Sequence, residues 1–533
     1  MTTNWTRALR QELTQRLPVT HLLPDEQPAY VRSAVYLFGV ITIASFALVI
    51  ATGTILAFFG PQWWHTNGIG HFFNSLHLWS VEVLFFFMVL HLWGTFLQGA
   101  WRDGRAHTWM LGAISFVVSI GAAFTGYLSQ TNFDAQWIAS SAKDAMNAMG
   151  IGGFFNVLNF GQMYGIHIML LPAALVALIA VHILLVRLRG VVRPYPARGE
   201  TRPAYARGMT QDEYYRGVRM VPYDLLREAT VMGVVVLVLV VVLAGIFSSP
   251  DASPLTMRSV AQSDPLGFVT VALAELDGTS TLARYGPPYN HGQASVQYAG
   301  PVSLQQLGGV SLPIDTAQTY VLGPLATVRN ATVSADLRTF RAAPSGQQHQ
   351  WEVAYAAALG NADGSLDAEG HLVVATGDYG PLPLLFGALL DIARSGALDG
   401  ILLTNGIFYQ SDFTRPLLFL NEQALPERAS QLNLLGTQWG MTNETGRYPG
   451  QAWLWLYTFW YQVPFGPYNG ANADVAVWLT MAILTLALIL LPYIPWLNRV
   501  PELVRGYRLI WRQHYQEVRR QRASGPPPTA PIT

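Results

Sequence analysis

The chain contains no cysteine among its 533 residues. This absence excludes disulfides, thiolate-bound iron–sulfur clusters, zinc–cysteine sites and covalent haem attachment through C-x-x-C-H. Any redox centre must therefore be held by histidine, methionine, tyrosine or carboxylates. Charge is also scarce, because only 12% of the residues are charged, against roughly 25% in ordinary soluble domains. The net charge is zero, which argues against a nucleic-acid partner, and the hydrophobic share of 51% indicates a membrane protein.

Six segments are apolar over the length of about 20 residues that a helix needs to cross a bilayer. These predicted spans are residues 34–58, 76–98, 109–130, 164–188, 228–247 and 475–497. The arginine-rich start of the chain precedes a polar interval and then a full-length span. We therefore do not expect it to be a signal peptide.

The distribution of Lys and Arg predicts the orientation of the spans. The loop 59–75 has neither residue and 131–163 has only Lys143, whereas arginines gather in the other loops and at both ends of the chain. By the positive-inside rule, both termini are cytoplasmic in a multi-pass protein of the cell (plasma) membrane. The predicted parts are a cytoplasmic segment (1–33), a four-helix bundle (34–190), a basic loop (191–227), a fifth helix (228–247), an extracytoplasmic domain (248–474), a sixth helix (475–497) and a basic tail (498–533) with a Pro-rich, disordered end.

The predicted extracytoplasmic domain has turn signals and short β-rich runs such as "HLVVATGD" and "TYVLGPLATV". This pattern predicts an α/β or mainly β fold. The aromatic stretch 449–468 is expected to form an amphipathic interfacial helix that could cover a quinone pocket. The histidines of this domain lack the spacing of metal ligands and are expected to be exposed or structural; they are His291, His349 and His371.

Four histidines lie within two of the predicted spans. His77 and His91 are 14 residues apart, which places them within about 40° on one helix face and about 21 Å apart along the axis. His167 and His182 are 15 apart, or about 60° around the helix, an offset that a kink at Pro172 could absorb. The two spans run in the same direction, so the histidines pair by depth as His77/His167 and His91/His182.

Two such pairs across facing helices predict two bis-histidine haem sites. A lone intramembrane histidine is more often a helix–helix hydrogen bond or a proton relay. Four histidines at matched depths favour haem over that alternative.

Glycines on the neighbouring spans repeat the same spacing. Gly39 and Gly53 on the first span are 14 residues apart, and so are Gly112 and Gly126 on the third. A flat macrocycle needs neighbouring helices without side chains where it passes them, which glycine provides. The alternative is small-residue packing between membrane helices.

Residues 30–195 resemble cytochrome b, the dihaem membrane subunit of quinol-oxidising cytochrome bc complexes. The similar segments are "LHLWSVEVLFFFMVLHLWGTFLQGAWRDGRAHTW" from residue 76, "TGYL" from 125 and "MYGIHIMLLP" from 163. The resemblance implies two noncovalent b-type haems. It assigns His77 and His167, beside Gly53 and Gly126, to an outer low-potential haem. It likewise assigns His91 and His182, beside Gly39 and Gly112, to a cytoplasmic-side high-potential haem.

The same resemblance implies the function and the partners. The chain would transfer electrons between quinol and partner redox proteins, as an all-α haem bundle within a respiratory complex. A Rieske-type iron–sulfur subunit and a cytochrome c subunit are the expected partners, with membrane lipid around them. The complex would have several subunits, a dimer being one arrangement of it.

The chain also departs from the family pattern. Asn74 and Gln162 stand where the family usually has arginines that serve the propionates of the outer haem, and "SQTN" (129–132) replaces the usual Pro-Trp. No Pro-Glu-Trp-Tyr occurs, although its glutamate serves quinol oxidation in the family. The C-terminal helices are reduced to two spans on either side of a large insertion.

Glu82 is the nearest intramembrane carboxyl to the outer haem ligands, about 7.5 Å along the helix from His77. Quinol oxidation releases protons, so Glu82 is a candidate proton acceptor. The alternative is a neutral carboxyl that is hydrogen-bonded inside the bundle. Glu444 or Asp412 of the external domain could also supply the acid.

Two other functions stay open at this point. The chain could be a dihaem anchor that links a different extracytoplasmic oxidoreductase to the quinone pool. It could also be a sensor or scaffold that has lost its haems, although the presence of all four histidines argues against that.

Overall fold

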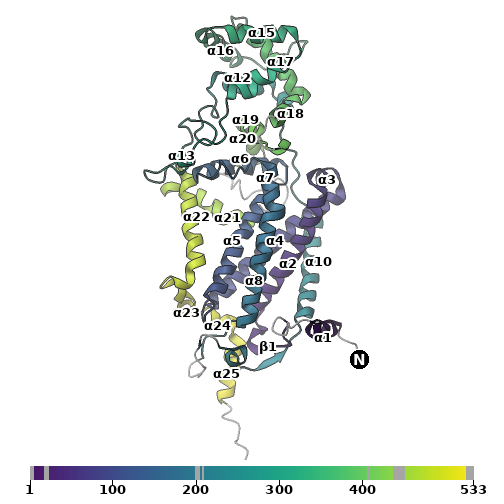
Figure 1. The fold of residues 1–533 in the computed structure, drawn as a ribbon, viewed down its shortest axis with the longest axis vertical. Coiled ribbons are helices and arrows are strands. Elements are labelled where there is room, and N and C mark those ends of the chain that lie inside the picture. The colour runs from purple at the N-terminus through teal and green to yellow at the C-terminus, as the bar shows by residue number, and fades with distance from the viewer. Residues whose placement is uncertain are drawn as a thin grey trace, which may run out of the picture. The chain divides into compact units, whose positions relative to one another are not determined.

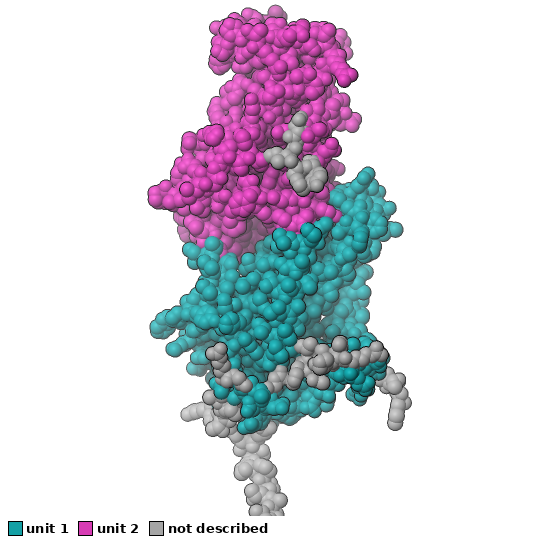
Figure 2. All heavy atoms as spheres, in the orientation of Figure 1, with its two compact units in different colours: residues 1–123, 168–249, 482–533 teal, residues 124–167, 250–481 magenta. Residues whose placement is uncertain are grey.

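The computed structural model describes residues 5–16, 23–197, 205–206, 209–404, 409–435 and 451–523. The chain divides into two compact units, coloured differently in Figure 2: unit 1 holds residues 1–123, 168–249 and 482–533, and unit 2 holds 124–167 and 250–481. The predicted Pro-rich end lies outside the described residues.

Six helices are long and apolar enough to cross a membrane, which confirms the six predicted spans. They are Ala34–Phe59, Gly68–Leu97, Ala106–Leu128, Phe160–Arg189, Leu225–Phe247 and Ala473–Tyr493. The second begins eight residues before the predicted start, because Asn67 caps it. The Asn67 side chain accepts hydrogen bonds from the N–H groups of Ile69 (2.9 Å) and Gly70 (3.2 Å), which otherwise have no partner at a helix start.

Unit 1 contains most of the apolar helices. Its helices and strands are α1 (Trp5–Arg16), β1 (Glu26–Pro28), η1 (Ala29–Arg32), α2 (Ala34–Phe59), α3 (Pro61–Thr66), α4 (Gly68–Leu97), the larger part of α5 (Ala106–Leu128), α8 (Leu171–Arg189), α9 (Gln211–Tyr214), β2 (Met220–Pro222), α10 (Leu225–Phe247), the end of α22 (Ala473–Leu490), η9 (Leu491–Tyr493), η10 (Leu497–Arg499), α23 (Val500–Val504), α24 (Tyr507–Ile510) and α25 (Arg512–Ala523). The strands β1 and β2 pair antiparallel, with Glu26 opposite Pro222.

The core of unit 1 lies where α10 packs against α2 and α4 (Figure 1). Its buried side chains come from all three helices and include Ile41 of α2, Val83 of α4 and Val240 of α10. Close packing of this kind, rather than removal of apolar surface from water, holds helices together in a bilayer. The three helices therefore form a fixed frame on which the side chains of α2 and α4 are held.

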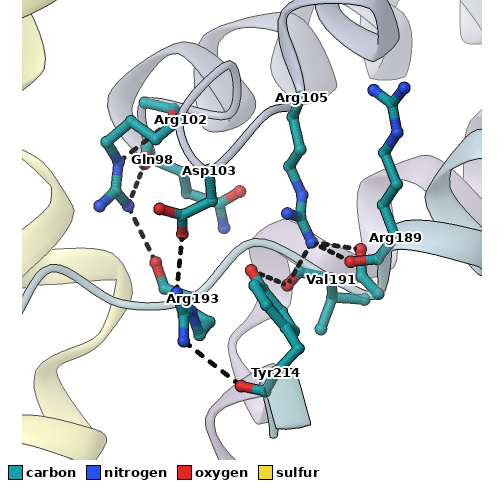
Figure 3. A network of polar contacts seen from close by, with 10 residues as sticks. Gln98, Arg102, Asp103, Arg105, Arg189, Val191, Arg193 and Tyr214 are labelled. Carbon is teal, nitrogen blue, oxygen red and sulfur yellow. Dashed lines mark hydrogen bonds and ion pairs between the residues drawn. The ribbon is translucent and has the colours of Figure 1, made fainter. Parts of the chain in front are cut away.

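Buried arginines tie the end of α8 to the loop between α4 and α5 (Figure 3). The Arg105 guanidinium donates to the carbonyl oxygens of Arg189 (2.6 Å), Gly190 (2.7 Å) and Val191 (3.1 Å), which end α8. Cations are favoured at helix C-termini, where carbonyl oxygens have no partner within the helix. Arg193 forms an ion pair with Asp103 at 3.4 Å, so the segment after α8 is fastened as well.

Unit 2 contains the rest of the chain and is helical. Its elements are the end of α5, α6 (Phe133–Ala148), α7 (Phe160–Gly165), the start of the π-helical turn η2 (Ile166–Leu170), α11 (Met257–Ser263), α12 (Pro265–Asp277), α13 (Leu304–Gly308), the π-helical turn η3 (Ala317–Leu322), α14 (Gly323–Ala326), α15 (Ala331–Ala342), α16 (Ser345–Leu359), α17 (Leu382–Ser395), α18 (Ala397–Thr404), η4 (Tyr409–Ser411), α19 (Thr414–Leu420), α20 (Ala424–Gln431), η7 (Ala452–Leu454), α21 (Trp455–Tyr461), η8 (Gly466–Asn469) and the first half of α22.

The prediction of an α/β or mainly β domain over 248–474 is wrong, since the described part of this segment holds helices and only isolated β-bridges. The run "TYVLGPLATV" forms η3 and α14, with Pro324 in the first turn of a helix, where its missing N–H costs nothing. The run "HLVVATGD" is an irregular segment with one bridge between Leu366 and Leu372. Apolar β-branched residues predict burial more reliably than they predict strands.

Candidate haem-binding site

The four predicted histidines lie on two helices. His77 and His91 are on α4 and His182 is on α8, all in unit 1, whereas His167 lies in η2, at the end of the unit 2 segment 124–167. His91 and His182 are close enough for their charges to interact. The two histidines expected at the deeper level are therefore neighbours in unit 1.

Each of these three histidines, His77, His91 and His182, has a glycine against its ring. A Cβ built on Gly53 would lie 2.9 Å from Cε1 of His77, and one on Gly39 would lie 3.2 Å from Cε1 of His91. On α5, a Cβ on Gly112 would lie 3.0 Å from Cε1 of His182.

Unit 2 repeats this arrangement, because a Cβ on Gly126 would clash with the His167 ring. All four predicted glycines therefore leave room for the histidine predicted at the same level. Small-residue packing alone would bring glycines against helix backbones in general, without selecting four imidazoles.

Hydrogen bonds at Nδ1 fix the ring state of two of these histidines. Thr52 Oγ1 lies 3.0 Å from Nδ1 of His77 and also 2.8 Å from the carbonyl oxygen of Leu48, to which its hydroxyl donates. Because that proton is already used, the hydroxyl oxygen accepts from His77 Nδ1–H. His182 Nδ1 lies 3.1 Å from the carbonyl oxygen of Thr108, so it must donate too. In both rings Nδ1 carries the proton and Nε2 the lone pair, which is the tautomer typical of histidine metal ligands.

The carbonyl group of Thr108, which orients His182, lies in a segment that an arginine side chain holds in place. Arg189 Nη1 donates to the carbonyl oxygen of Gly104 at 2.9 Å and lies 3.4 Å from Oγ1 of Thr108. Together with the Arg105 contacts of Figure 3, these contacts of Arg189 hold the start of α5 and the end of α8 together.

The helix that carries His167 and His182 contains a π-helical turn, η2, directly before Pro172. A π turn closes its hydrogen bond one residue later than an α turn and so takes up one extra residue. A 15-residue step that includes such a turn has nearly the phase of a 14-residue step in a regular helix. We expected Pro172 to absorb the offset; the π turn beside it supplies the physical means.

Neither residue that replaces a family arginine is charged, and both are engaged in the protein. Gln162 accepts from the backbone N–H of Asn156 (2.6 Å) and donates to the carbonyl oxygen of Phe154 (2.7 Å), so it shapes its own loop. Asn74 is buried and donates to Ser249 Oγ at 3.3 Å. Within the described residues, its Oδ1 has no hydrogen-bond partner.

The candidate acids lie apart from one another in the chain. Glu82 is partly buried on α4 in unit 1. Asp412, in unit 2, is buried and accepts from the N–H (3.0 Å) and hydroxyl (2.5 Å) of Thr414, which suits a local structural role at the start of α19. Glu444 lies outside the described residues.

The histidines of the segment 248–474 do not come together. His349 faces Glu352 at 3.8 Å and His371 faces Asp391 at 3.5 Å, while His291 is exposed. In the part of the chain that the structure describes, no group of three or more His, Asp or Glu side chains could hold a metal ion. A haem iron differs from such a site because its macrocycle supplies four ligands and the protein only two.

Comparison with known proteins finds similarity in the part of the chain that carries most of these residues. Residues 82–254 match the family model "Cytochrome b(N-terminal)/b6/petB". This part of the chain is therefore similar to the N-terminal part of cytochrome b. A cytochrome b6 of Heliobacterium modesticaldum is 26% identical over 189 residues, covering 31% of this chain and 89% of the relative. The "Menaquinol:cytochrome c reductase cytochrome b subunit" of Geobacillus thermodenitrificans is 27% identical over 213 residues, covering 34% of this chain and 95% of the relative.

A solved structure titled "Hyperthermophilic respiratory Complex III" is similar over 73% of this chain and 98% of its own, at 16% identity and a TM-score of 0.35. We draw nothing further from a score of that size. Six apolar helices and this similarity make the chain a multi-pass membrane protein, part of which resembles the cytochrome b subunits of bc-type complexes.

The sequence did not reveal Thr52 or the Thr108 carbonyl as partners of histidine rings. The available sequence signal for Thr52 was its position on α2, directly before Gly53. A backbone carbonyl carries no sequence signal at all.

Proposed function

We propose that this protein is a cytochrome b that binds two b haems, one between His77 and His167 and one between His91 and His182. The observation that carries the proposal is that each of four glycines on α2 and α5 lies against one of these four rings. A bound b haem supplies reversible one-electron chemistry at its iron. The chain's own part is to hold two ligands per haem at fixed orientation, through the bonds from His77 to Thr52 and from His182 to Thr108.

The two haem levels would carry electrons across the membrane between a quinol and partner redox proteins. With both termini cytoplasmic, 248–474 would be extracytoplasmic, and quinol would be oxidised at the level of His77 and His167. A Rieske-type subunit and a cytochrome c subunit are the partners that fit this reaction. The name of the Geobacillus relative describes that protein as a menaquinol:cytochrome c reductase subunit, which supports the same assignment here.

A pyridine haemochrome assay of the purified protein tests the haem number. We expect two extractable b haems per chain. His91→Ala and His182→Ala should each remove the same haem, the one of higher potential, and leave the other spectrally intact. His371→Ala, which alters an external histidine, is the matched control and should keep both. If His91→Ala and His182→Ala leave spectrally different haems, the pairing is wrong.

A second candidate is a dihaem anchor that connects another extracytoplasmic oxidoreductase to the quinone pool. The engagement of Gln162 with its own loop favours it, since that side chain replaces a propionate-binding arginine of the quinol-oxidising family. Purification of the native complex distinguishes the two: a Rieske-type subunit supports the first function, and a different oxidoreductase supports the second.

A further inference from the structure

A hydrogen-bonded row of polar side chains connects α21 with the start of α22 in unit 2. Tyr457 Oη lies 3.0 Å from Tyr461 Oη, and Tyr461 Oη donates to Oδ1 of Asp474 at 2.6 Å. We call Tyr457, Tyr461 and Asp474 the Tyr–Asp row. None of the three was a candidate from the sequence.

Asp474 is arranged as an acceptor on both oxygens. Oδ2 accepts from Nε2 of Gln297 at 2.5 Å, and the Gln297 amide is oriented because its Oε1 accepts from Val475 N–H at 3.1 Å. Neither Asp474 oxygen donates a hydrogen bond to these partners, and both accept, as the oxygens of an ionised carboxylate do. Asp474 also lies in the first turn of α22, where the helix dipole favours negative charge. The row therefore ends at a base.

The charged groups that act on Asp474 come from one neighbouring helix. They are Lys143 and Asp144 of α6, which pair with each other at 3.0 Å. Lys143 is buried and lies 5.5 Å from the centroid of the Tyr285 ring, and the Tyr285 hydroxyl donates to Asp144. Asp474 thus faces an ion pair, in which Asp144 offsets the charge of Lys143.

The row begins next to the segment that carries an outer haem ligand. Gly126, which contacts the His167 ring, is followed by Tyr127, whose ring lies 6.2 Å from that of Trp453. Trp453 lies in η7, directly before α21, and its indole donates to Gln451 at 2.7 Å. Tyr457 is one helical turn further along. Within unit 2, the ring contact at Trp453, one helical turn of the chain and the Tyr–Asp row thus lie between the His167 level and Asp474.

An unused donor lies at the head of the row. The Trp478 ring lies 5.9 Å from that of Tyr457, and among the described residues its buried Nε1 has no hydrogen-bond partner. An indole N–H is a donor only, and burying one without an acceptor costs free energy. An oxygen acceptor from outside the chain, such as a quinone or quinol oxygen, would satisfy it.

We propose that the Tyr–Asp row receives the proton that quinol loses at the outer site. This inference rests on the proposed quinol oxidation and names its proton acceptor. The quinol O–H bond breaks and leaves its electron pair on the quinol oxygen. The proton moves to Tyr457 Oη, the proton of Tyr457 moves to Tyr461, and the proton of Tyr461 moves to Asp474, whose carboxylate becomes a carboxylic acid. Charge and atoms balance, since one anion is replaced by another.

The two tyrosines suit the role of relays. Burial raises the pKa of Tyr457 and of Tyr461 above the ordinary value, so both keep a proton at rest and pass one on without storing charge. The row thus takes the place of the glutamate motif that this chain lacks.

The test uses the full-length protein with both haems bound and measures haem reduction by decylubiquinol and by a menaquinol analogue between pH 6 and 9. Tyr461→Phe and Asp474→Asn should slow reduction at least tenfold at pH 6 to 7, because general-base catalysis contributes roughly 10²–10⁴-fold. The deficit should shrink as pH rises, since hydroxide replaces the missing base. Asp474→Glu should restore the rate, and Tyr468→Phe, which removes only a contact with Thr480, should leave it unchanged.

Haem content and the dithionite-reduced spectrum show whether each variant is intact. If Asp474→Asn loses haem, Tyr461→Phe carries the test. Wild-type rates in both variants at every pH would overturn the proposal. Loss of rate in Glu82→Gln alone would move the proton acceptor to Glu82 and overturn it as well. If the wild-type haems are not reduced by either quinol, the proposed function itself is wrong.

Discussion

Substitution of Thr52 by valine tests how the protein orients an outer haem ligand. Valine has nearly the shape of threonine but cannot accept the hydrogen bond from His77 Nδ1–H, which measures 3.0 Å. That bond increases the electron density on the imidazole and so favours the ferric state of a bound iron. The variant should therefore bind the outer haem more weakly and with a higher midpoint potential.

The size of the effect follows from the strength of the bond. A hydrogen bond of this kind contributes about 0.5–1.5 kcal/mol. A tenfold change in an equilibrium constant is about 1.4 kcal/mol, or about 59 mV for one electron. We expect the potential of the outer haem to rise by roughly 20–60 mV. Removal of a partner behind a metal ligand also costs about 10–100-fold in affinity.

Potentiometric titration of the α-band, with both haems resolved, measures the shift. Thr54→Val is the matched control, because the Thr54 hydroxyl is on the same helix and donates only to the carbonyl oxygen of Ile50 at 2.7 Å. The reasoning is refuted if Thr52→Val leaves the outer potential within error of the control, or if the inner haem shifts instead.

Three further predictions concern the haem level, the topology and the external domain. Gly53→Val should remove the outer haem, leaving about one b haem per chain by pyridine haemochrome, whereas Gly233→Val, where nothing lies within 4 Å, should keep two. Because the chain has no cysteine, an introduced cysteine is the only residue of this protein that a maleimide can label in intact cells. Ser345→Cys should react with an impermeant maleimide, and Arg519→Cys should not. Burial raises the pKa of Glu275 to about 8, so the free energy of unfolding should fall as pH rises from about 4.5 to about 8. Glu275→Gln should flatten that decline in Tm, and an unchanged decline would contradict the assignment.

The membrane part could be predicted from the sequence because its signals are strong and local. Uninterrupted apolar length predicted the six spans, and the shared 14-residue spacing of His77 and His91 and of Gly39 and Gly53 predicted two levels, at each of which a glycine lies against a histidine ring. Helix geometry converts such spacings directly into depth and face. The same arithmetic could not show the π turn, because hydrogen bonding along the backbone leaves no residue signature.

The external domain and the Tyr–Asp row could not be predicted in this way. Val321 and Leu325 have strand-like neighbours in the sequence, yet they are buried on η3 and α14, since tertiary packing overrides a weak local preference. Gln297 and Asp474 are 177 residues apart and meet only through the fold. Contacts of that kind depend on the whole chain.

The π-helical turn η2 has a consequence for how such chains change length. A helix that stores one surplus residue in a wide turn can lose that residue and return to regular α-helix, with the ligands above and below it still facing the same side. A one-residue deletion or insertion, which would rotate every later side chain by about 100° in a regular helix, is here absorbed within one turn. Between relatives, a histidine step of 14 or of 15 can therefore serve the same pair of ligands, and the step alone is a poor guide to kinship.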